Sequence, residues 1–454
     1  MASKHSGTQD LAGLTRSELI AVIGRRDEVI AELRKRLEEW ERKSARQASP
    51  FSKNKPKADP KRPGRKPGQG LFTRRQEPVA QATDVKIQAS TPEQCPHCGG
   101  EVELERVDEA TTTDIPKKPE PVVTRFSVPV CRCKKCGKSV QGQAAGLAAD
   151  QAGATAHRVG TQAMATAHEL HYGRGIPVRK VPGVMQALTG LTVTASAITQ
   201  DALKQAEGPV GAAYEKLGRE MQKAPAVHAD DTSWRIGGCP AFLMGFDSNE
   251  ASYYQIRYQH RSLEVLEVIP ANYAGVLITD RGVSYEAKVF DLVRQQKCLS
   301  HLLKNISVIL EIKTGPARWF GTELQKLLRE GIALSKSPPG ENWAQQVEDL
   351  ETRLTWHLRD RILIDDDNQR LLNGIGSQMD RDRILTFLKV PGVDPTNNRA
   401  ERMLRLAVIA RKVSHCSKNE RGAYASAAFL SLIQTARKTT SDFASSLSSI
   451  LAIA

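Results

Sequence analysis

Three acidic residues stand in sequence settings that suit phosphoryl transfer. Asp230 closes a short apolar run in VHADDTSW, Asp280 ends the β-branched run GVLITD, and Glu401 lies in the basic segment DPTNNRAERMLR. Magnesium is a hard cation that takes oxygen ligands, and a pair of such ions clamps the attacking and leaving oxygens of a phosphodiester. We therefore expect these acids to converge on a site for two Mg²⁺ or Mn²⁺ ions.

Cysteines form a second group with metal-ligand spacing. Two CxxC pairs, each followed by Gly, supply four thiols: Cys95, Cys98, Cys133 and Cys136. Four thiolates in two such pairs bind Zn²⁺ tetrahedrally, and the glycines allow the tight turns. We expect a structural zinc ribbon over residues 81–145. His97 and Cys131 are spare donors, and Cys131 stays an alternative to Cys133.

Composition indicates a polyanionic partner. The 454 residues carry a formal net charge of +14, which favours nucleic acid. Residues 1–80 hold 19 Lys and Arg against 10 Asp and Glu, so +9 of that charge lies there. No apolar run approaches the length of a membrane span or of a signal peptide. We expect a cytoplasmic protein with reduced cysteines and no membrane partner.

The elements that position these residues begin with a helical segment, 1–47. Thr15 and Glu18 fit a capping box. Apolar residues then recur with a heptad period, interrupted by Arg26, at Leu19, Ile23, Ile30, Leu33, Leu37 and Trp40. This pattern predicts a coiled coil and hence a homo-oligomer. The alternative is an amphipathic helix packed on its own domain.

A basic linker follows over residues 48–80. It is rich in Lys, Arg, Pro and Gly and cannot bury a core, so we expect it to be disordered or extended. Its RPGRKPG piece would lay Arg62, Arg65 and Lys66 along a phosphate backbone or into a narrow minor groove. A solvated linker is the alternative.

Residues 146–222 are Ala-rich and predict a helical domain, broken by Gly and Pro at YGRGIPV. Within it, TVTASAITQDALKQA is typical of a helix-turn-helix element that would bind DNA. Of the two interpretations, a plain helical connector is the favoured one.

Strand patterns begin at residue 223. AVHAD, AFLMGFD and ASYYQIRYQ predict three consecutive antiparallel strands, and a helix through SLEVLEVIP leads to the strand GVLITD. This order predicts a multidomain α/β protein with a ribonuclease-H-like core, whose first part is 223–300. In that fold the first and fourth strands are neighbours, which would bring Asp230 and Asp280 together. An all-helical insertion (301–390) and a core completion with C-terminal helices (391–454) would follow. Within the insertion the pattern predicts helices over Leu302–Ile312, Trp319–Leu334, Trp343–Leu358 and Asn368–Phe387.

The helix that carries Glu401 also carries arginines. Arg402 and Arg405 would offer guanidinium groups to phosphate, and Arg411 and Lys412 add positive charge further along. We expect these four residues to contact DNA. Asn397 and Asn398 would cap the start of the helix.

Two histidines lie near the predicted acids. His301 follows Cys298 at i, i+3 in KCLSHLLKN, a spacing that could provide half a metal site, although the sequence offers no second half. His301 would instead contact the scissile phosphate or a metal-bound water. His228 shares the sheet face of Asp230 by strand alternation, which suggests packing or support of the ligands. A buried thiol and a hydrogen-bonded histidine are the structural alternative for Cys298 and His301.

Five segments together resemble a known family. VHADDTSWR, LITDRGVSYEA, KCLSHLLKN, TNNRAERMLR and GAYASAAFLSLIQTARK are similar, in this order, to the DDE transposases of the bacterial insertion-sequence-66 family. The resemblance implies that Asp230, Asp280 and Glu401 are catalytic in a bacterial, nucleoid-associated protein. The partners that it implies are transposon ends and target DNA, with other proteins of the same element as further candidates. The usual Asp-Glu-Thr reads Asp-Asp-Thr here, a change beside the ligand that keeps the charge.

Two other functions fit the same sequence. One is a non-catalytic zinc-ribbon DNA-binding regulator that retains an inactive core. The other is a ribonuclease-H-like nuclease that hydrolyses DNA without strand transfer.

Overall fold

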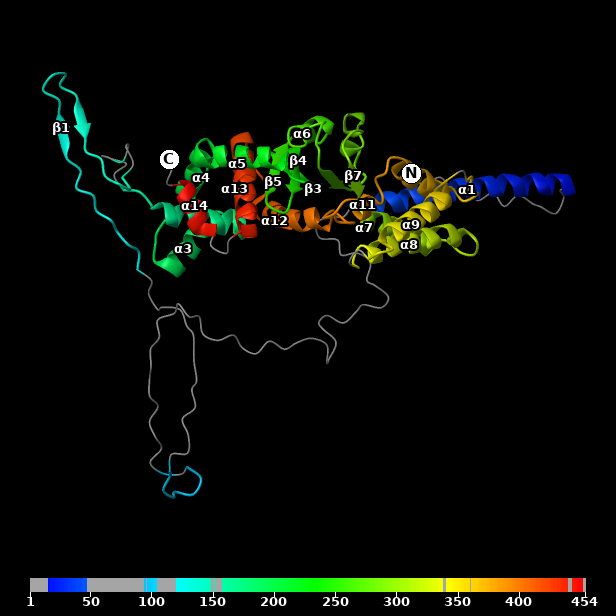
Figure 1. Ribbon diagram of the computed structural model, residues 1–454, viewed down its shortest axis with the longest axis horizontal. Coiled ribbons are helices and arrows are strands. Elements are labelled where there is room, and N and C mark those ends of the chain that lie inside the picture. The colour runs from blue at the N-terminus through cyan, green and yellow to red at the C-terminus, as the bar shows by residue number, and fades with distance from the viewer. Residues whose placement is uncertain are drawn as a thin grey trace. The chain divides into compact units, whose positions relative to one another are not determined.

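The computed structural model describes residues 15–46, 94, 96–103, 120–147, 151, 157–337, 340–359, 361–439 and 443–451 (Figure 1). The chain divides into two units, Met1–Asp114 and Ile115–Ala454, which we treat separately. The predicted DNA contacts Arg62, Arg65 and Lys66 and the predicted zinc ligand Cys95 lie outside the described residues. The part of the chain that is described contains no helix long and apolar enough to cross a membrane.

The first unit contains one long helix, α1 (Arg16–Arg46). The Leu19 amide donates to the Thr15 carbonyl at 3.0 Å, which places Thr15 at the start of the helix as expected. Its apolar side chains lie largely in solvent: Ile20, Ile23, Val29, Ile30 and Leu33 are 46–61% exposed. The same unit holds a turn around Cys98, closed by an isolated bridge between Gln94 and Glu101.

A small hairpin opens the described part of the second unit. Strands β1 (Val130–Arg132) and β2 (Ser139–Gln141) pair antiparallel. The Cys133 amide donates to Lys138 O at 2.8 Å, and the Gly137 amide donates to Cys133 O at 2.9 Å. Gly137 has φ +70°, a conformation that glycine adopts without steric cost. These bonds close a tight turn over Cys133–Lys138.

The predicted helical domain is helical. Its elements are α2 (Thr161–His168), the π-helix η3 (Glu169–Gly173), α3 (Val181–Thr189), α4 (Ala195–Ala206) and α5 (Pro209–Met221). Helix α3 ends at Gly190 in the left-handed region, and Thr194 caps α4 by accepting from the Ala197 amide at 3.1 Å. Helix α5 packs on both the sheet strand β5 and helix α13.

A five-stranded mixed sheet forms the centre of the second unit. Its strands are β3 (Ala226–Ile236), β4 (Cys239–Asp247), β5 (Ser252–Arg257), β6 (Val276–Thr279) and β7 (Gln295–Lys297), in the spatial order β5-β4-β3-β6-β7. The first three strands are antiparallel, whereas β3–β6 and β6–β7 are parallel. The predicted neighbourhood of the first and fourth strands is therefore confirmed.

Strand β3 is longer than the sequence suggested. Asp230 was expected to close it, but β3 continues to Ile236 because the residues beyond Asp230 pair with β4 up to a hairpin turn at Gly237 and Gly238. Both glycines have positive φ, at +58° and +87°. What does end near Asp230 is the parallel pairing with β6, whose last pair joins His228 and Ile278.

The connections between β5 and β7 contain only short helical elements. Helix α6 spans only Ser262–Leu266, whereas the predicted helix reached Pro270. Two 3₁₀ turns, η4 (Val283–Tyr285) and η5 (Lys288–Phe290), follow β6.

Five helices occupy the predicted insertion and its edges: α7 (Leu299–Ile312), α8 (Ala317–Leu334), α9 (Trp343–Leu358), α10 (Asp366–Asp380) and α11 (Thr386–Lys389). The predicted single helix 368–387 is interrupted between α10 and α11, where Asp382 adopts φ +52°. Apolar residues of these helices form one core that includes Val276 and Ile278 of β6. The insertion therefore shares a core with the sheet.

Three helices complete the unit: α12 (Asn398–Ser414), α13 (Glu420–Thr439) and α14 (Phe443–Leu451). Helix α12 packs on β3 and β4, and α13 packs on β5 (Figure 1). Their apolar faces contribute to the main core, with residues such as Met403, Leu404 and Phe429 buried against the sheet. This packing carries Glu401, distant in sequence, to the strand that holds Asp230.

Candidate active site

The strand register places two of the predicted acids opposite each other. In the parallel pairing Ala226 faces Val276 and His228 faces Ile278, a constant offset of 50 residues. The pairing ends there, and Asp230 and Asp280 each lie two residues beyond this last pair. Asp280 Oδ1 accepts from the Gly282 amide at 2.7 Å, and Asp230 Oδ1 accepts from the Asp231 amide at 2.9 Å. The backbone thus orients both carboxylates at the sheet edge where β6 ends.

The pKa of Asp230 indicates that Glu401 lies near the two aspartates. Burial, and then the charges of Asp280, Asp231 and Glu401, raise the pKa of Asp230 to about 7, although the hydrogen bond from the Asp231 amide acts in the opposite direction. Within the described residues, no Lys or Arg side chain lies within ion-pair distance of Asp230 or Asp280. Two neighbouring carboxylates without a Lys or Arg partner are suited to a divalent cation.

Asp231 is directed differently from its neighbour. Its Oδ1 lies 3.2 Å from His260 Nδ1, and successive side chains of a strand point to opposite faces. This partner favours Asp230 as the ligand, in line with the choice made from the sequence.

Helix α12 is anchored by Asn397, which is completely buried. Asn397 occupies the N-cap position but makes no side-chain cap bond, so the expected capping role is wrong. Its Nδ2 instead donates to Ala229 O at 2.8 Å, and its backbone amide donates to Cys298 Sγ at 3.1 Å. One residue therefore links the start of α12 to β3 and to the start of α7.

His228 supports the same junction from β3. Its Nδ1 lies 3.3 Å from Asn397 Oδ1 and its Nε2 lies 3.3 Å from Asp394 Oδ2. Because the Asn397 amide nitrogen is engaged by Ala229, its oxygen faces His228, and the histidine Nδ1 is the donor. Burial lowers the pKa of His228. The side chain is therefore a support of the α12 junction and contacts none of the three acids through a hydrogen bond.

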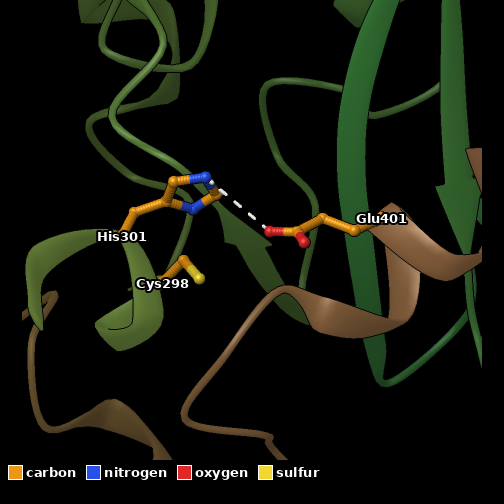
Figure 2. A group of neighbouring side chains, drawn as sticks. All are labelled: Cys298, His301 and Glu401. Atoms are coloured by element: carbon orange, nitrogen blue, oxygen red, sulfur yellow. Dashed lines mark ion pairs between the residues drawn. The ribbon is translucent and has the colours of Figure 1, made fainter. Parts of the chain in front are cut away.

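Cys298 and His301 lie beside Glu401. Figure 2 shows both side chains at the start of α7, facing the carboxylate on α12. His301 Nε2 is 3.7 Å from Glu401 Oε1. Contact with the Cys298 thiol, and then the charges of Cys298, Glu401 and Asp280, raise the pKa of His301 to about 9 against burial. Burial alone would raise the pKa of Cys298, but His301 and the Asn397 amide outweigh it and lower the pKa.

The predicted DNA-contacting residues of α12 divide into two groups. Arg402, Arg405 and Lys412 are exposed. Arg411 is instead held against β3, where its guanidinium donates to Thr232 Oγ1 at 3.0 Å and to Ser233 O and Oγ at 2.5 Å. Three of the four cations are therefore presented to solvent.

Lys297 is a site residue that the sequence did not reveal. It is completely buried, and its Nζ contacts Glu286 Oε1 at 2.5 Å, Thr279 Oγ1 at 3.2 Å and Asp280 O at 3.3 Å. Lys297 thus fixes the backbone of Asp280 through its carbonyl oxygen. Because lysine side chains are usually exposed, the sequence alone predicts a surface position for Lys297.

The hairpin turn distinguishes two candidate zinc ligands. Hydrogen bonds from the backbone amides of Cys136 and Lys135, together with the Cys136 side chain, lower the pKa of Cys133. Cys131 lies on strand β1 opposite Val140, outside this turn. Amides that stabilise a thiolate favour Cys133 as the ligand.

The chain thus combines a five-stranded mixed sheet with a cluster of acidic side chains near the carboxyl end of its β3–β6 parallel pair. The sequence model of the transposase IS66 family matches residues 157–425, which is more than half of the chain, so the chain belongs to this family. Membership supports a transposase role and implies action on DNA. Comparison with curated proteins gave no match.

Proposed function

We propose that this chain is a DDE transposase that binds the ends of an insertion sequence, cleaves strands and joins them to target DNA. Asp230, Asp280 and Glu401 would be the catalytic acids of a ribonuclease-H-like core. The observation that carries the proposal is the meeting of these acids from β3, the end of β6 and α12, which is reflected in the raised pKa of Asp230. The strand order β5-β4-β3-β6-β7 supports the fold assignment.

The three acids would hold two Mg²⁺ or Mn²⁺ ions, which supply Lewis-acid activation of water and then of a DNA 3′-hydroxyl. Asp230 is central among the acids, since the charges of both Asp280 and Glu401 act on it. His301 would face the scissile phosphate as a cation. Arg402 and Arg405, exposed on the helix of Glu401, would neutralise phosphates of the bound strand.

Strand cleavage of DNA carrying the element ends tests the proposal. Wild type should nick the ends in Mg²⁺, Asp280→Asn should not, and Asp349→Asn, an acid on helix α9, should behave as wild type. If the chain is a regulator, wild type and Asp280→Asn will bind DNA equally and neither will cut.

Precut ends separate a transposase from a nuclease of the same fold. A transposase joins a supplied 3′-hydroxyl to target DNA, whereas a nuclease hydrolyses without joining. Failure to join in Mg²⁺, by a preparation that cleaves, would leave the nuclease as the function.

For the hairpin we propose that Cys133 and Cys136 are zinc ligands within a zinc ribbon. Metal analysis of the purified protein should give bound Zn²⁺ that Cys133→Ser releases. Cys131→Ser, which alters a strand residue of the same hairpin, should retain it. Retention by the first variant and loss by the second would assign the ligand to Cys131.

A further inference from the structure

The second half of the Cys298–His301 pair is Glu401. Cys298 is the N-cap residue of α7 and His301 lies in its first turn, a separation at which two helical side chains are neighbours. Glu401 reaches the pair from α12, about a hundred residues further along the chain. One ligand atom from each of the three residues lies within 4.8 Å of the others (Figure 2).

The donor set differs from that of the acidic cluster. A thiolate, an imidazole and a carboxylate are ligands of Zn²⁺ and similar borderline-soft ions, whereas Mg²⁺ takes oxygen. His301 Nδ1 is buried and makes no hydrogen bond of ordinary geometry. The Cys298 side chain is buried, but those of His301 and Glu401 are 42% and 40% exposed, which leaves an approach from solvent.

The spacing is close to what a single ion requires. Zinc–ligand bonds of about 2.0–2.3 Å set neighbouring ligand atoms about 3–4 Å apart. His301 Nε2 and Glu401 Oε1 are already separated by 3.7 Å. Small side-chain rotations would bring the three donors onto one ion, with water in the fourth position.

We propose that Cys298, His301 and Glu401 form a binding site for a thiophilic divalent cation, Zn²⁺ above all, that competes with the magnesium ions for Glu401. The competition rests on the proposed function, because it requires Glu401 to serve the catalytic ions. The binding site itself does not. Occupancy by Zn²⁺ would withdraw one acid from the catalytic group and make the enzyme zinc-sensitive.

Cobalt titration tests the site without reference to activity. Full-length protein is first saturated with Zn²⁺ and then dialysed against a mild chelator, which empties the half-exposed three-donor site but leaves a four-thiolate zinc ribbon filled, as metal analysis after dialysis checks. Co²⁺ is then added, and thiolate-to-cobalt charge-transfer absorption is followed in the near ultraviolet. Wild type should bind one equivalent with this absorption, as should Cys239→Ser, which removes an exposed thiol at the start of β4.

Two variants should lose that equivalent. Cys298→Ser retains an acceptor for the Asn397 amide, and His301→Gln changes a half-exposed side chain, so the two test the site by independent routes. Absorption that persists in both variants, or that is absent from wild type, overturns the site.

Cleavage assays in fixed Mg²⁺ test the competition. Each protein's rate is normalised to its own rate without zinc, and added Zn²⁺ should inhibit wild type but not Cys298→Ser, with relief by excess Mg²⁺. Equal inhibition of both proteins, or no inhibition of wild type, would overturn the competition. A cobalt site in a protein that cleaves nothing in Mg²⁺ would contradict the transposase proposal and leave the metal site standing.

Discussion

At the scale of single residues, the acidic cluster is costly to the metal-free protein. Asp230 is largely buried beside Asp280, Asp231 and Glu401, and burial together with their charges disfavours its ionised form. Groups arranged for binding or catalysis commonly reduce stability in this way. The acids are therefore expected to be retained for what they bind.

Removing one like charge should stabilise the fold while it abolishes activity. Asp280→Asn keeps the shape of the side chain and the oxygen that accepts from Gly282, but removes the repulsion with Asp230. We expect a rise in Tm of about 2–4 °C, the size that corresponds to about 1 kcal/mol in a domain of this class. Differential scanning fluorimetry without added metal measures it, with Asp349→Asn as the matched control. A fall in Tm would mean that Asp280 is a structural partner in the metal-free protein.

Metal binding should depend on pH through Asp230. Its pKa is raised from 3.8 to about 7, and only the carboxylate form binds a cation. Below pH 7 one proton must leave for each site filled, so the affinity for Mn²⁺ should fall about tenfold per pH unit, and it should level off above pH 7. Calorimetry in buffers of different ionisation enthalpy would detect the released proton. An affinity independent of pH below 7 would contradict the shift.

The same shift affects the stability of the metal-free fold. Because the pKa of Asp230 is higher in the folded than in the unfolded chain, the stability it contributes is fully present below about pH 4. That contribution is lost as the pH rises towards 7. Metal binding and folding thus respond to pH in opposite directions at this residue.

At the scale of elements, periodic apolar patterns predicted most of the strands and helices. They did not predict where those elements end, because contacts with other elements determine the ends. Strands β3 to β6, the neighbourhood of β3 and β6, and four of the insertion helices follow from β-branched runs and helical spacing, whereas β7, with the sequence QQK, was not predicted. The extent of β3 does not follow from these patterns, because Asp231–Ile236 is held by pairing with β4 and not by its own apolar pattern. The break before α11 depends on Asp382 at positive φ, which its sequence context does not signal.

The candidate site divides in the same way. The proximity of Asp230 and Asp280 was predictable because apolar runs mark β3 and β6 and the fold makes these strands neighbours, although β3 continues past Asp230. The role of Asn397 was not, since its side chain bonds to β3 and its amide to Cys298, contacts that exist only after α12 has docked. Glu401 as a partner of Cys298 and His301 was missed for the same reason.

Asn397 should control the position of Glu401. Asn397→Ala removes the bond to Ala229 O and leaves buried polar groups without partners, a loss of about 1–3 kcal/mol. We expect weaker Mn²⁺ binding and slower cleavage at temperatures well below the Tm, where a purely structural residue would leave both unchanged. Asn398→Ala, an exposed neighbour on the same helix, is the matched control. Unchanged Mn²⁺ affinity in Asn397→Ala would show that α12 docks without this residue.

At the scale of the whole molecule, the chain combines a catalytic-type unit with a basic N-terminal part. Nine of the fourteen net positive charges lie within the first 80 residues, apart from the unit that holds the acids. Charge of this kind supplies affinity for the DNA backbone without sequence preference. Specific recognition of element ends would then depend on the second unit, or on more than one chain acting together.

The exposed seam of α1 should determine how many chains act together. Ile23, Ile30 and Leu33 are 46–59% exposed in the single chain, although their heptad spacing is that of a coiled-coil interface. Replacing Ile23 and Ile30 together by Glu places charges in that interface, and light scattering over a range of concentrations should show a shift from oligomer to single chains. Ala31→Glu, an exposed position off the seam, should retain the oligomer. If α1 packs on its own domain instead, the double variant will lower the Tm and leave the mass unchanged. That result would place oligomerisation, where it occurs, outside this helix.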